Sequence, residues 1–271
     1  MEFDPLDPNT GARFAEEIAY AEARLAGEAT TLALDLYLPA EARGEAPLLV
    51  WFHGGGFNAQ AFPAVQHRRL GRQLTAAGFA LAAPRYRQKA GEADLGPVLR
   101  RALPDLSENC APNLPEGFSG APALAAMEDA LSALAWLEAH RAALGLAPNP
   151  VVAGSEAGGF TAFNAAFAAP SLGLASIPLG GVLSYSGGLS WPGCFVPGRL
   201  PVFAMQTPRD PRIPPENLRH LARSDPALEL IEAPEQQPGS IKLWPGEAKA
   251  ECYGRIRAFL KRCSARAAEA A

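Results

Sequence analysis

Two glycine-rich stretches hold the residues whose types and spacing could do chemistry: HGGGF, residues 53–57, and GSEAGGF, residues 154–160. Consecutive glycines let the backbone approach a ligand closely and leave N–H groups free to bind an oxyanion. A carboxylate at the start of a helix, as Glu156 would be, is favoured by the helix dipole and by such N–H donors. The two stretches therefore predict an oxyanion-binding site with an acidic residue at its centre.

The elements that must position these stretches are short apolar runs separated by helical patterns. Such alternation is typical of a mostly parallel sheet that is covered on both faces. We expect strands over Thr31–Leu38, Leu48–Phe52, Ala80–Pro84, Val151–Gly154, Gly181–Ser184, Val202–Gln206 and Leu228–Ile231. We expect helices over His67–Ala77, Ala123–Leu144, Pro215–Arg223 and Ala248–Arg262. The prediction is one α/β domain, residues 1–271, that binds ligands at the carboxyl ends of its strands.

Two segments are predicted to cover those strand ends. Residues 88–121 are polar and broken by proline and glycine, which is typical of an excursion rather than of a core element. Long loops in compact domains act as lids or binding loops, or lie as solvated surface. We interpret residues 88–121 as a possible lid and residues 1–30 as an N-terminal cover segment, with a plain surface loop as the alternative.

The charge and composition exclude several classes of partner. The net charge is -4, the pI is about 5.7, and acidic and basic residues are interspersed, so we expect neither a nucleic-acid face nor a membrane signal. There is no secretory signal and no apolar run of the ~18 residues that a membrane span needs, so we expect a cytoplasmic protein. The cysteines show neither metal-ligand nor disulfide spacing. We expect a small-molecule substrate or ligand, no metal and no organic cofactor, and the sequence does not indicate an oligomeric state.

The motifs together resemble the α/β-hydrolase superfamily, in the esterase and lipase branch with an HGGG oxyanion loop and a GxSxG nucleophile elbow. LDLYLP (residues 34–39), APRYR (residues 83–87) and LPVFAMQTPRDPRIPPENLRHL (residues 200–221) are similar to the same branch, and the resemblance runs from about Leu34 to Leu260. It implies a doubly wound α/β-hydrolase sheet. It also implies the N–H groups of Gly55, Gly56 and Ala157 as an oxyanion hole, and His53 as a structural residue of that loop.

The catalytic positions depart from the family pattern. Alignment with GxSxG places Glu156 where the family has its nucleophilic serine. Ser155 is a possible substitute, although we expect its side chain to point to a different face of the turn. The family's triad histidine follows the last strand, yet no histidine follows His220. A serine without an imidazole to take its proton is a poor nucleophile. We therefore do not expect ordinary serine-esterase chemistry.

Asp210 lies at the position that matches the acidic member of the family's triad. The resemblance implies a catalytic role for its carboxylate. The alternative is local, because an aspartate in the sequence PRDPRIPPEN can cap the turn that follows it. Both interpretations stay open from the sequence.

Three hypotheses describe what Glu156 could do. It could be a covalent nucleophile, as the elbow aspartate is in haloalkane dehalogenases and epoxide hydrolases, although those enzymes also use a histidine. It could be a general acid or base beside the oxyanion hole, if a closed site and a nearby Asp210 favour its protonated form. The protein could instead be a pseudoenzyme or binding protein whose Glu156 blocks its own oxyanion hole. Acid–base chemistry on a small carbonyl- or ester-containing molecule is the working hypothesis.

Aromatic residues near the motifs are the candidate walls of a substrate pocket. They are Phe57, Tyr86, Phe160 and Trp191. Each is also compatible with a place in the hydrophobic core. If they line a pocket, the ligand should be small and moderately apolar.

Overall fold

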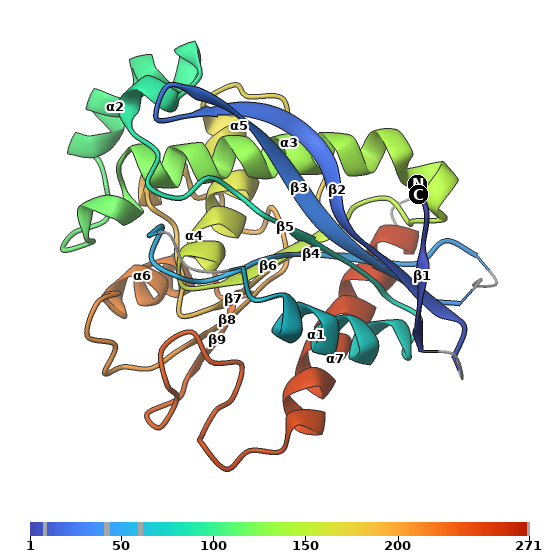
Figure 1. Ribbon diagram of the computed structural model, residues 1–271. Coiled ribbons are helices and arrows are strands. Elements are labelled where there is room, and N and C mark those ends of the chain that lie inside the picture. Colours follow the sequence, from blue (N-terminus) through green and yellow to red (C-terminus); the bar gives the residue numbers. More distant parts are fainter. Residues whose placement is uncertain (8–9, 41–43, 59–61, 270–271) are drawn as a thin grey trace.

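A nine-stranded mixed sheet forms the centre of the computed structural model, which describes residues 1–7, 10–40, 44–58 and 62–269 (Figure 1). The strand order is β1-β2-β3-β5-β4-β6-β7-β8-β9. β1, β2, β3 and β5 pair antiparallel in that order, whereas the strands from β5 to β9 along the sheet are parallel. The sheet is therefore mostly parallel, as predicted.

The parallel strands are short, and all except the edge strand β9 are buried over most of their length. They are β4 (Leu48–Phe52), β5 (Ala80–Pro84), β6 (Val151–Ser155), β7 (Gly181–Tyr185), β8 (Val202–Gln206) and β9 (Glu229–Glu232). Their ends differ from the predicted ends by at most one residue. The predictions succeed because a strand covered on both faces is a continuous apolar run, which the sequence displays directly.

The first thirty residues add strands to the sheet instead of covering its strand ends. β1 (Asp4–Asp7), β2 (Ala12–Leu25) and β3 (Glu28–Leu38) form consecutive antiparallel pairs. The prediction of an N-terminal cover segment was wrong because the register of β2 shifts twice, between Ala15 and Ile18 and between Ala19 and Ala21. Each shift breaks the two-residue alternation by which a strand is recognised.

Helices cover both faces of the sheet (Figure 1). The α-helices are α1 (Ala64–Thr75), α2 (Pro97–Glu108), α3 (Ala121–Leu144), α4 (Ala157–Phe163), α5 (Ala169–Ser171), α6 (Glu216–Ser224) and α7 (Lys249–Glu269). Short 3-10 turns lie at Glu92–Asp94, Glu116–Phe118 and Pro192–Cys194, and a π-helical turn at Asn164–Ala168 joins α4 to α5. None of the helices in the described part of the chain combines the length and hydropathy that crossing a bilayer requires.

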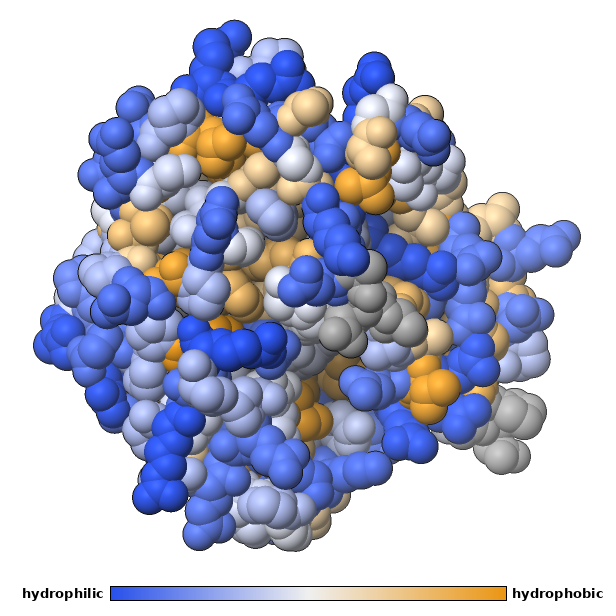
Figure 2. All heavy atoms as spheres, turned by 60° about the vertical axis from the view of Figure 1, so that its left-hand side comes forward, coloured by the Kyte–Doolittle hydropathy of each residue, from blue (hydrophilic) through white to orange (hydrophobic). Residues whose placement is uncertain are grey.

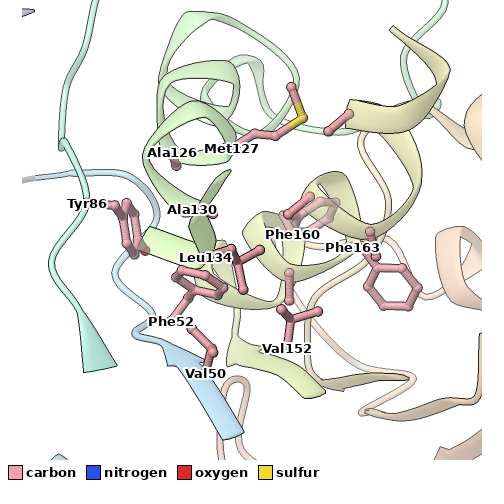
Figure 3. Close-up of a cluster of buried hydrophobic side chains, with 14 of the residues drawn as sticks. Val50, Phe52, Tyr86, Ala126, Met127, Ala130, Leu134, Val152, Phe160 and Phe163 are labelled. Atoms are coloured by element: carbon pink, nitrogen blue, oxygen red, sulfur yellow. The ribbon is translucent and has the colours of Figure 1, made fainter. Parts of the chain in front are cut away.

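The core has two layers, one on each face of the sheet. Leu49 of β4 belongs to the layer that packs on α1 and α7, whereas its neighbour Val50 belongs to the layer that packs on α3 and α4. Alternate residues of a strand point to opposite faces, so one short strand supplies both layers. Figure 3 shows the second layer, where Phe52 and Val152 of the sheet lie beneath Leu134 and Phe160.

The predicted excursion, residues 88–121, is more regular than expected. It contains α2, whose Leu99 and Leu106 are buried. The sequence conceals this helix because Pro97 begins it and Pro104 lies inside it. Proline suits the first turn of a helix but removes an N–H donor further along, so the pattern suggests a broken segment.

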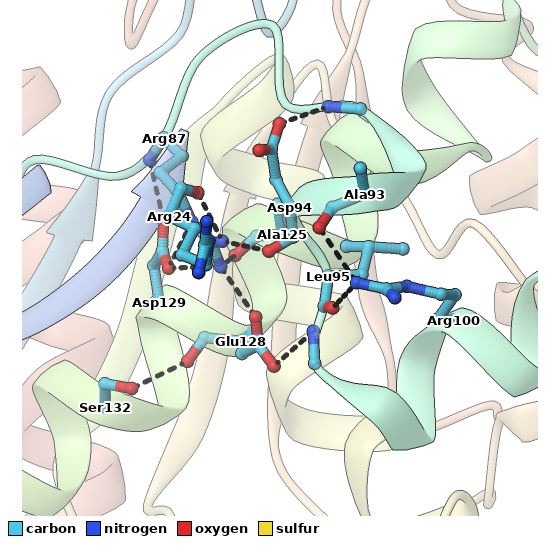
Figure 4. A network of polar contacts seen from close by, with 12 residues as sticks. Arg24, Arg87, Ala93, Asp94, Leu95, Arg100, Ala125, Glu128, Asp129 and Ser132 are labelled. Carbon is cyan, nitrogen blue, oxygen red and sulfur yellow. Dashed lines mark hydrogen bonds and ion pairs between the residues drawn. The ribbon is translucent and has the colours of Figure 1, made fainter. Parts of the chain in front are cut away.

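Buried charges hold part of this segment against α3 (Figure 4). The Arg87 Nε donates to Asp129 Oδ1 at 2.9 Å, and an Arg87 terminal nitrogen pairs with Glu128 at 2.7 Å. A second terminal nitrogen of Arg87 donates to the Asp94 carbonyl at 2.7 Å, and Glu128 accepts the Gly96 N–H at 3.2 Å. Burial raises the pKa of Asp129 to about 6, although its bonds to Arg87 act in the opposite direction. Backbone groups of residues 88–121 are thus fixed by a buried ion pair.

Candidate active site around Glu156

Glu156 lies at the apex of the sharp turn between β6 and α4. Its φ is 47° and its ψ is -116°, a conformation that residues with a side chain seldom adopt. Its N–H donates to the Tyr185 carbonyl at 2.9 Å, and its carbonyl accepts the Phe160 N–H at 3.0 Å. These two bonds fix the strained backbone, so Glu156, and not Ser155, occupies the apex.

The small residues around the apex are required by packing. A Cβ atom on Gly158 would overlap the carbonyl group of Phe52, and one on Gly154 would overlap Gly158. Each substitution would therefore push the elbow away from β4. These glycines are needed for the turn itself, whether or not the turn supports catalysis.

The Glu156 carboxylate is occupied on both oxygens. Its Oε1 accepts a hydrogen bond from the Arg212 guanidinium at 2.8 Å, and its Oε2 accepts the Gly55 N–H at 3.2 Å. The Glu156 side chain is 15% exposed and that of Arg212 is 53% exposed, so the pair lies at the surface end of the site. The carboxylate thus contacts one guanidinium and one backbone N–H donor. One predicted oxyanion-hole donor, Gly55, thus binds the protein's own anion.

Asp210 organises the loop that carries Arg212. The Asp210 Oδ1 accepts the N–H groups of Arg212 at 3.0 Å and Ile213 at 2.9 Å. This is the turn-capping role that the sequence left open. Arg212 reaches Glu156 from this loop, and the prediction missed it, although it stands only two residues after Asp210.

The loop after β9 contributes a glycine where the resemblance implies a histidine. Gly239 has a φ of 75°, and a Cβ atom on it would lie 3.0 Å from the Cγ of Glu156 and 3.3 Å from its Cδ. Backbone therefore packs against the carboxylate at this place. Among the described residues, no hydrogen bond or ion pair joins Glu156 to an imidazole.

Comparisons with solved structures decide the fold family. The apo form of esterase 2 from Thermogutta terrifontis aligns with a TM-score of 0.67 and 20% identity, over 93% of this chain and 94% of that one. A phosphonate-inhibited esterase B from Lactobacillus rhamnosis aligns with a TM-score of 0.66 and 16% identity, over 96% and 88%. A bacterial heroin esterase aligns with a TM-score of 0.60 and 20% identity, over 92% and 85%. This chain has the α/β-hydrolase fold.

Sequence comparisons match less of the chain. The BD-FAE family model matches residues 34–96, from β3 into the segment before α2. No curated protein sequence matches the chain. The fold is thus confirmed by structure, whereas the chemistry must be argued from the residues of this chain.

His53 has a structural place in the glycine-rich loop that follows β4. Its Nδ1 lies 2.7 Å from the Gly54 carbonyl oxygen, and its ring stacks on Tyr86 with centroids 4.6 Å apart. The Tyr86 hydroxyl donates to the His53 carbonyl at 2.5 Å. Burial lowers the pKa of His53. These contacts hold the imidazole within the loop.

The four candidate wall residues lie in the core of this structure. Their exposed fractions are 2% for Phe57, 4% for Tyr86, 0% for Phe160 and 1% for Trp191. Figure 3 shows Tyr86 and Phe160 among the side chains of the hydrophobic cluster. Phe118, from residues 88–121, fills the space between them, with ring centroids 5.4 Å from Phe57 and 5.1 Å from Phe160. All four are therefore core residues, which was the alternative interpretation.

Ser155 was expected to point to a different face of the turn from Glu156, and this stays a prediction, since its Oγ and the Glu156 Oε2 would lie 3.0 Å and 3.3 Å from a Cβ atom on Gly54. Ser155 lines a cavity of about 460 Å³ together with His53, His67 and Lys249, and we call this the Ser155 cavity. The cavity lies on the α1 and α7 side of the sheet, since residues of both helices line it. Gly54 and Gly239 also line this cavity and border the Glu156 side chain, so the cavity reaches the elbow.

The surrounding surface is mostly polar. Figure 2 turns toward the viewer the side that carries α2, α4 and α6 in Figure 1. Hydrophilic residues predominate on it, and hydrophobic residues lie in small, separate patches. This face therefore offers little continuous apolar surface on which a partner could dock.

Proposed function

We propose that this α/β-hydrolase binds a small molecule without hydrolysing esters. The observation that carries the proposal is the pairing of the Glu156 carboxylate with the Gly55 N–H and the Arg212 guanidinium. A tetrahedral intermediate needs an N–H donor in this position for its developing negative charge. Glu156 already satisfies that donor, so the site resembles an oxyanion hole that is filled by the protein itself.

The contacts of Glu156 and the packing beside it also argue against ester hydrolysis. Both oxygens of the Glu156 carboxylate already have hydrogen-bond partners, the Arg212 guanidinium and the Gly55 N–H, so neither is free to attack a substrate. Gly239 places backbone, and no imidazole, against the Glu156 side chain. Phe118 fills the space between Phe57 and Phe160 where a substrate pocket was expected. Each of these features disfavours ester turnover at the elbow.

The test compares the wild type with Glu156→Gln on p-nitrophenyl acetate and butyrate. We expect both proteins to show the same rate as buffer, since neither has an activated nucleophile. Treatment with paraoxon should add no mass to Ser155 or Glu156. Esterase 2 from Thermogutta terrifontis, which paraoxon phosphorylates, is the positive control. Turnover by the wild type that disappears in Glu156→Gln would overturn the proposal.

Acid–base catalysis by Glu156 on a small carbonyl compound is the second candidate. It is favoured by the backbone at the apex, because a φ of 47° costs about 1–3 kcal/mol and such strain is concentrated at functional sites. The Arg212 side chain is also half exposed, so it can leave the carboxylate without crossing the core. The N–H groups of Gly55, Gly56 and Ala157 would then be available to an enolate oxygen.

Proton exchange distinguishes the second candidate from the first. If Glu156 is a general base, the α-protons of cyclohexanone should exchange with deuterium oxide in the wild type and faster in Arg212→Gln. Exchange should stop in Glu156→Gln. Equal exchange in all three proteins would exclude this candidate. A covalent role for Glu156 would instead give a trapped adduct, visible as a mass increase on that residue.

A further inference from the structure

We propose that the Ser155 cavity binds a small organic anion, in which a carboxylate or phosphate group is attached to an apolar body. This inference rests on the proposed small-molecule function, and it adds the place and the chemical class of the ligand. The cavity volume of about 460 Å³ lies within the range of small-molecule sites, which is roughly 300–1,000 Å³. Its walls come from the oxyanion loop, α1, the loop after β9 and the first turns of α7.

The charged groups around the cavity are all positive. Arg69, Lys242 and Lys249 line it, and among the described residues of its wall there is no Asp or Glu. Two carboxylates border this wall, Glu156 beside Gly239 and Glu247 beside Cys252. They pair with Arg212 and Arg255. An anion inside the cavity would therefore meet uncompensated positive charge.

The dipole of α7 adds to this charge. α7 extends over Lys249–Glu269, and its first residue, Lys249, is part of the cavity wall. The N-terminal end of a helix carries partial positive charge and N–H groups without partners inside the helix. The helix thus presents its anion-binding end to the same space as the three cations.

His67 supplies a polar group that lacks a partner. It is 2% exposed, and neither its Nδ1 nor its Nε2 has a hydrogen-bond partner within the described residues. Its ring packs against Phe62, with centroids 4.6 Å apart, and against His53 at 6.4 Å. Burial lowers the pKa of His67 to about 3, so the ring is neutral near pH 7. Both ring nitrogens are buried, so His67 contributes an unpaired polar ring to the cavity wall and not an exposed hydrogen-bonding group.

The remaining wall fits an apolar body. Trp51, Leu70 and Ile256 line the cavity, and each belongs to the core layer beneath α1 and α7. Their exposed fractions are 7%, 6% and 0%. A ligand with an aromatic or short aliphatic body could cover these side chains while its charged end reaches the lysines. Phenylacetate and phenyl phosphate have this form, and phenylacetamide has it without the charge.

Calorimetric titration with these three compounds tests the inference. We expect phenylacetate or phenyl phosphate to bind at least about tenfold more tightly than phenylacetamide, because only the anions gain from the positive wall. The stronger of the two identifies the anionic group. Binding should also shift the ring nitrogen resonances of His67, which are resolvable among the chain's four histidines.

Matched variants locate the site. Lys242→Gln combined with Lys249→Gln should weaken binding of the anion about tenfold, whereas Lys261→Gln should not, since Lys261 is on α7 but outside the cavity wall. Equal affinity for phenylacetamide, or unchanged affinity in the double variant, would overturn this inference. So would an absence of binding by all three compounds. Those results would leave the proposed function intact, because ester turnover that depends on Glu156 is what defeats it.

Discussion

The two sides of the elbow differ in how their positive groups are neutralised. On one side, Arg212 and the Gly55 N–H are bound by the protein's own carboxylate, Glu156. On the other side, Lys242 and Lys249 surround a cavity whose described wall contains no acidic residue. The same turn supports both arrangements, since Glu156 forms the ion pair and its neighbour Ser155 lines the cavity. A carboxylate of the protein thus occupies one anion-binding position, whereas the neighbouring cavity has positive side chains and no acidic residue in its described wall.

The largest effect is expected from a substitution that displaces the turn between β6 and α4. Gly158→Ala should destabilise the protein by about 3 kcal/mol, because the new Cβ atom would overlap the Phe52 carbonyl and displace the elbow. The measurement is the free energy of unfolding in urea. Both the Glu156 ion pair and the Ser155 cavity should be lost together.

Gly254→Ala is the control for that variant. Gly254 lies in α7, and a Cβ atom on it would meet nothing within 4 Å. Alanine is favoured over glycine in a helix, so this variant should be stabilised by about 0.5–1 kcal/mol. Equal effects of the two substitutions would mean that the elbow tolerates a larger residue and that its geometry is not fixed by this contact.

Acid should reveal the unpaired imidazole on the cavity side. The pKa of His67 is about 3 in the folded protein and 6.5 as the ordinary value. Because the folded-state pKa is the lower one, the unfolded chain binds the proton first. The stability from the neutral ring is therefore complete above pH 6.5 and is lost as the pH falls toward 3. Between pH 7 and pH 5 the loss should be about 2 kcal/mol.

His67→Phe isolates this contribution. Asp129 shifts in the opposite direction, since its pKa is raised to about 6, and it should stabilise the folded state as the pH falls below that value. Asp129 is the same in both proteins, so the difference between wild type and His67→Phe cancels it. Urea unfolding at pH 7 and pH 5 gives that difference. If the two proteins lose stability in parallel, His67 is not a buried neutral imidazole.

The strands and the apex were predictable because their signals are local. β4, β5 and β8 are apolar runs that are buried on both faces, and their sequence ends coincide with their structural ends. The apex at Glu156 followed from glycines at fixed spacing, and steric contacts in the structure explain that spacing. Signals of this kind come from residues that lie close together in the sequence.

The partners of the site were not predictable, because they depend on distant side chains. Arg212 is 56 residues from Glu156, and no spacing rule connects them. Phe118 lies in a segment that looked polar, and only the folded chain places it between Phe57 and Phe160. His67 lay at the start of a predicted helix, where nothing in the sequence marked its ring as buried. β2 was hidden because two register shifts interrupt its alternation.

The smallest effect is expected from substitutions in the ion pair between Glu156 and Arg212. Arg212→Gln should cost about 1 kcal/mol of unfolding free energy, because the ion pair is partly exposed and screened by solvent. Glu156→Gln should cost about the same, since the guanidinium loses its anion and the Gly55 N–H loses a charged acceptor. If the two residues act as a pair, the double variant should cost less than the sum of the single ones, with a coupling of about 0.5–1 kcal/mol. Arg209→Gln, an exposed change on the same loop, should be neutral within about 0.5 kcal/mol. Strictly additive costs would show that Glu156 is held by its backbone and the Gly55 N–H alone, and the closed side of the elbow would then be open to a ligand anion as well.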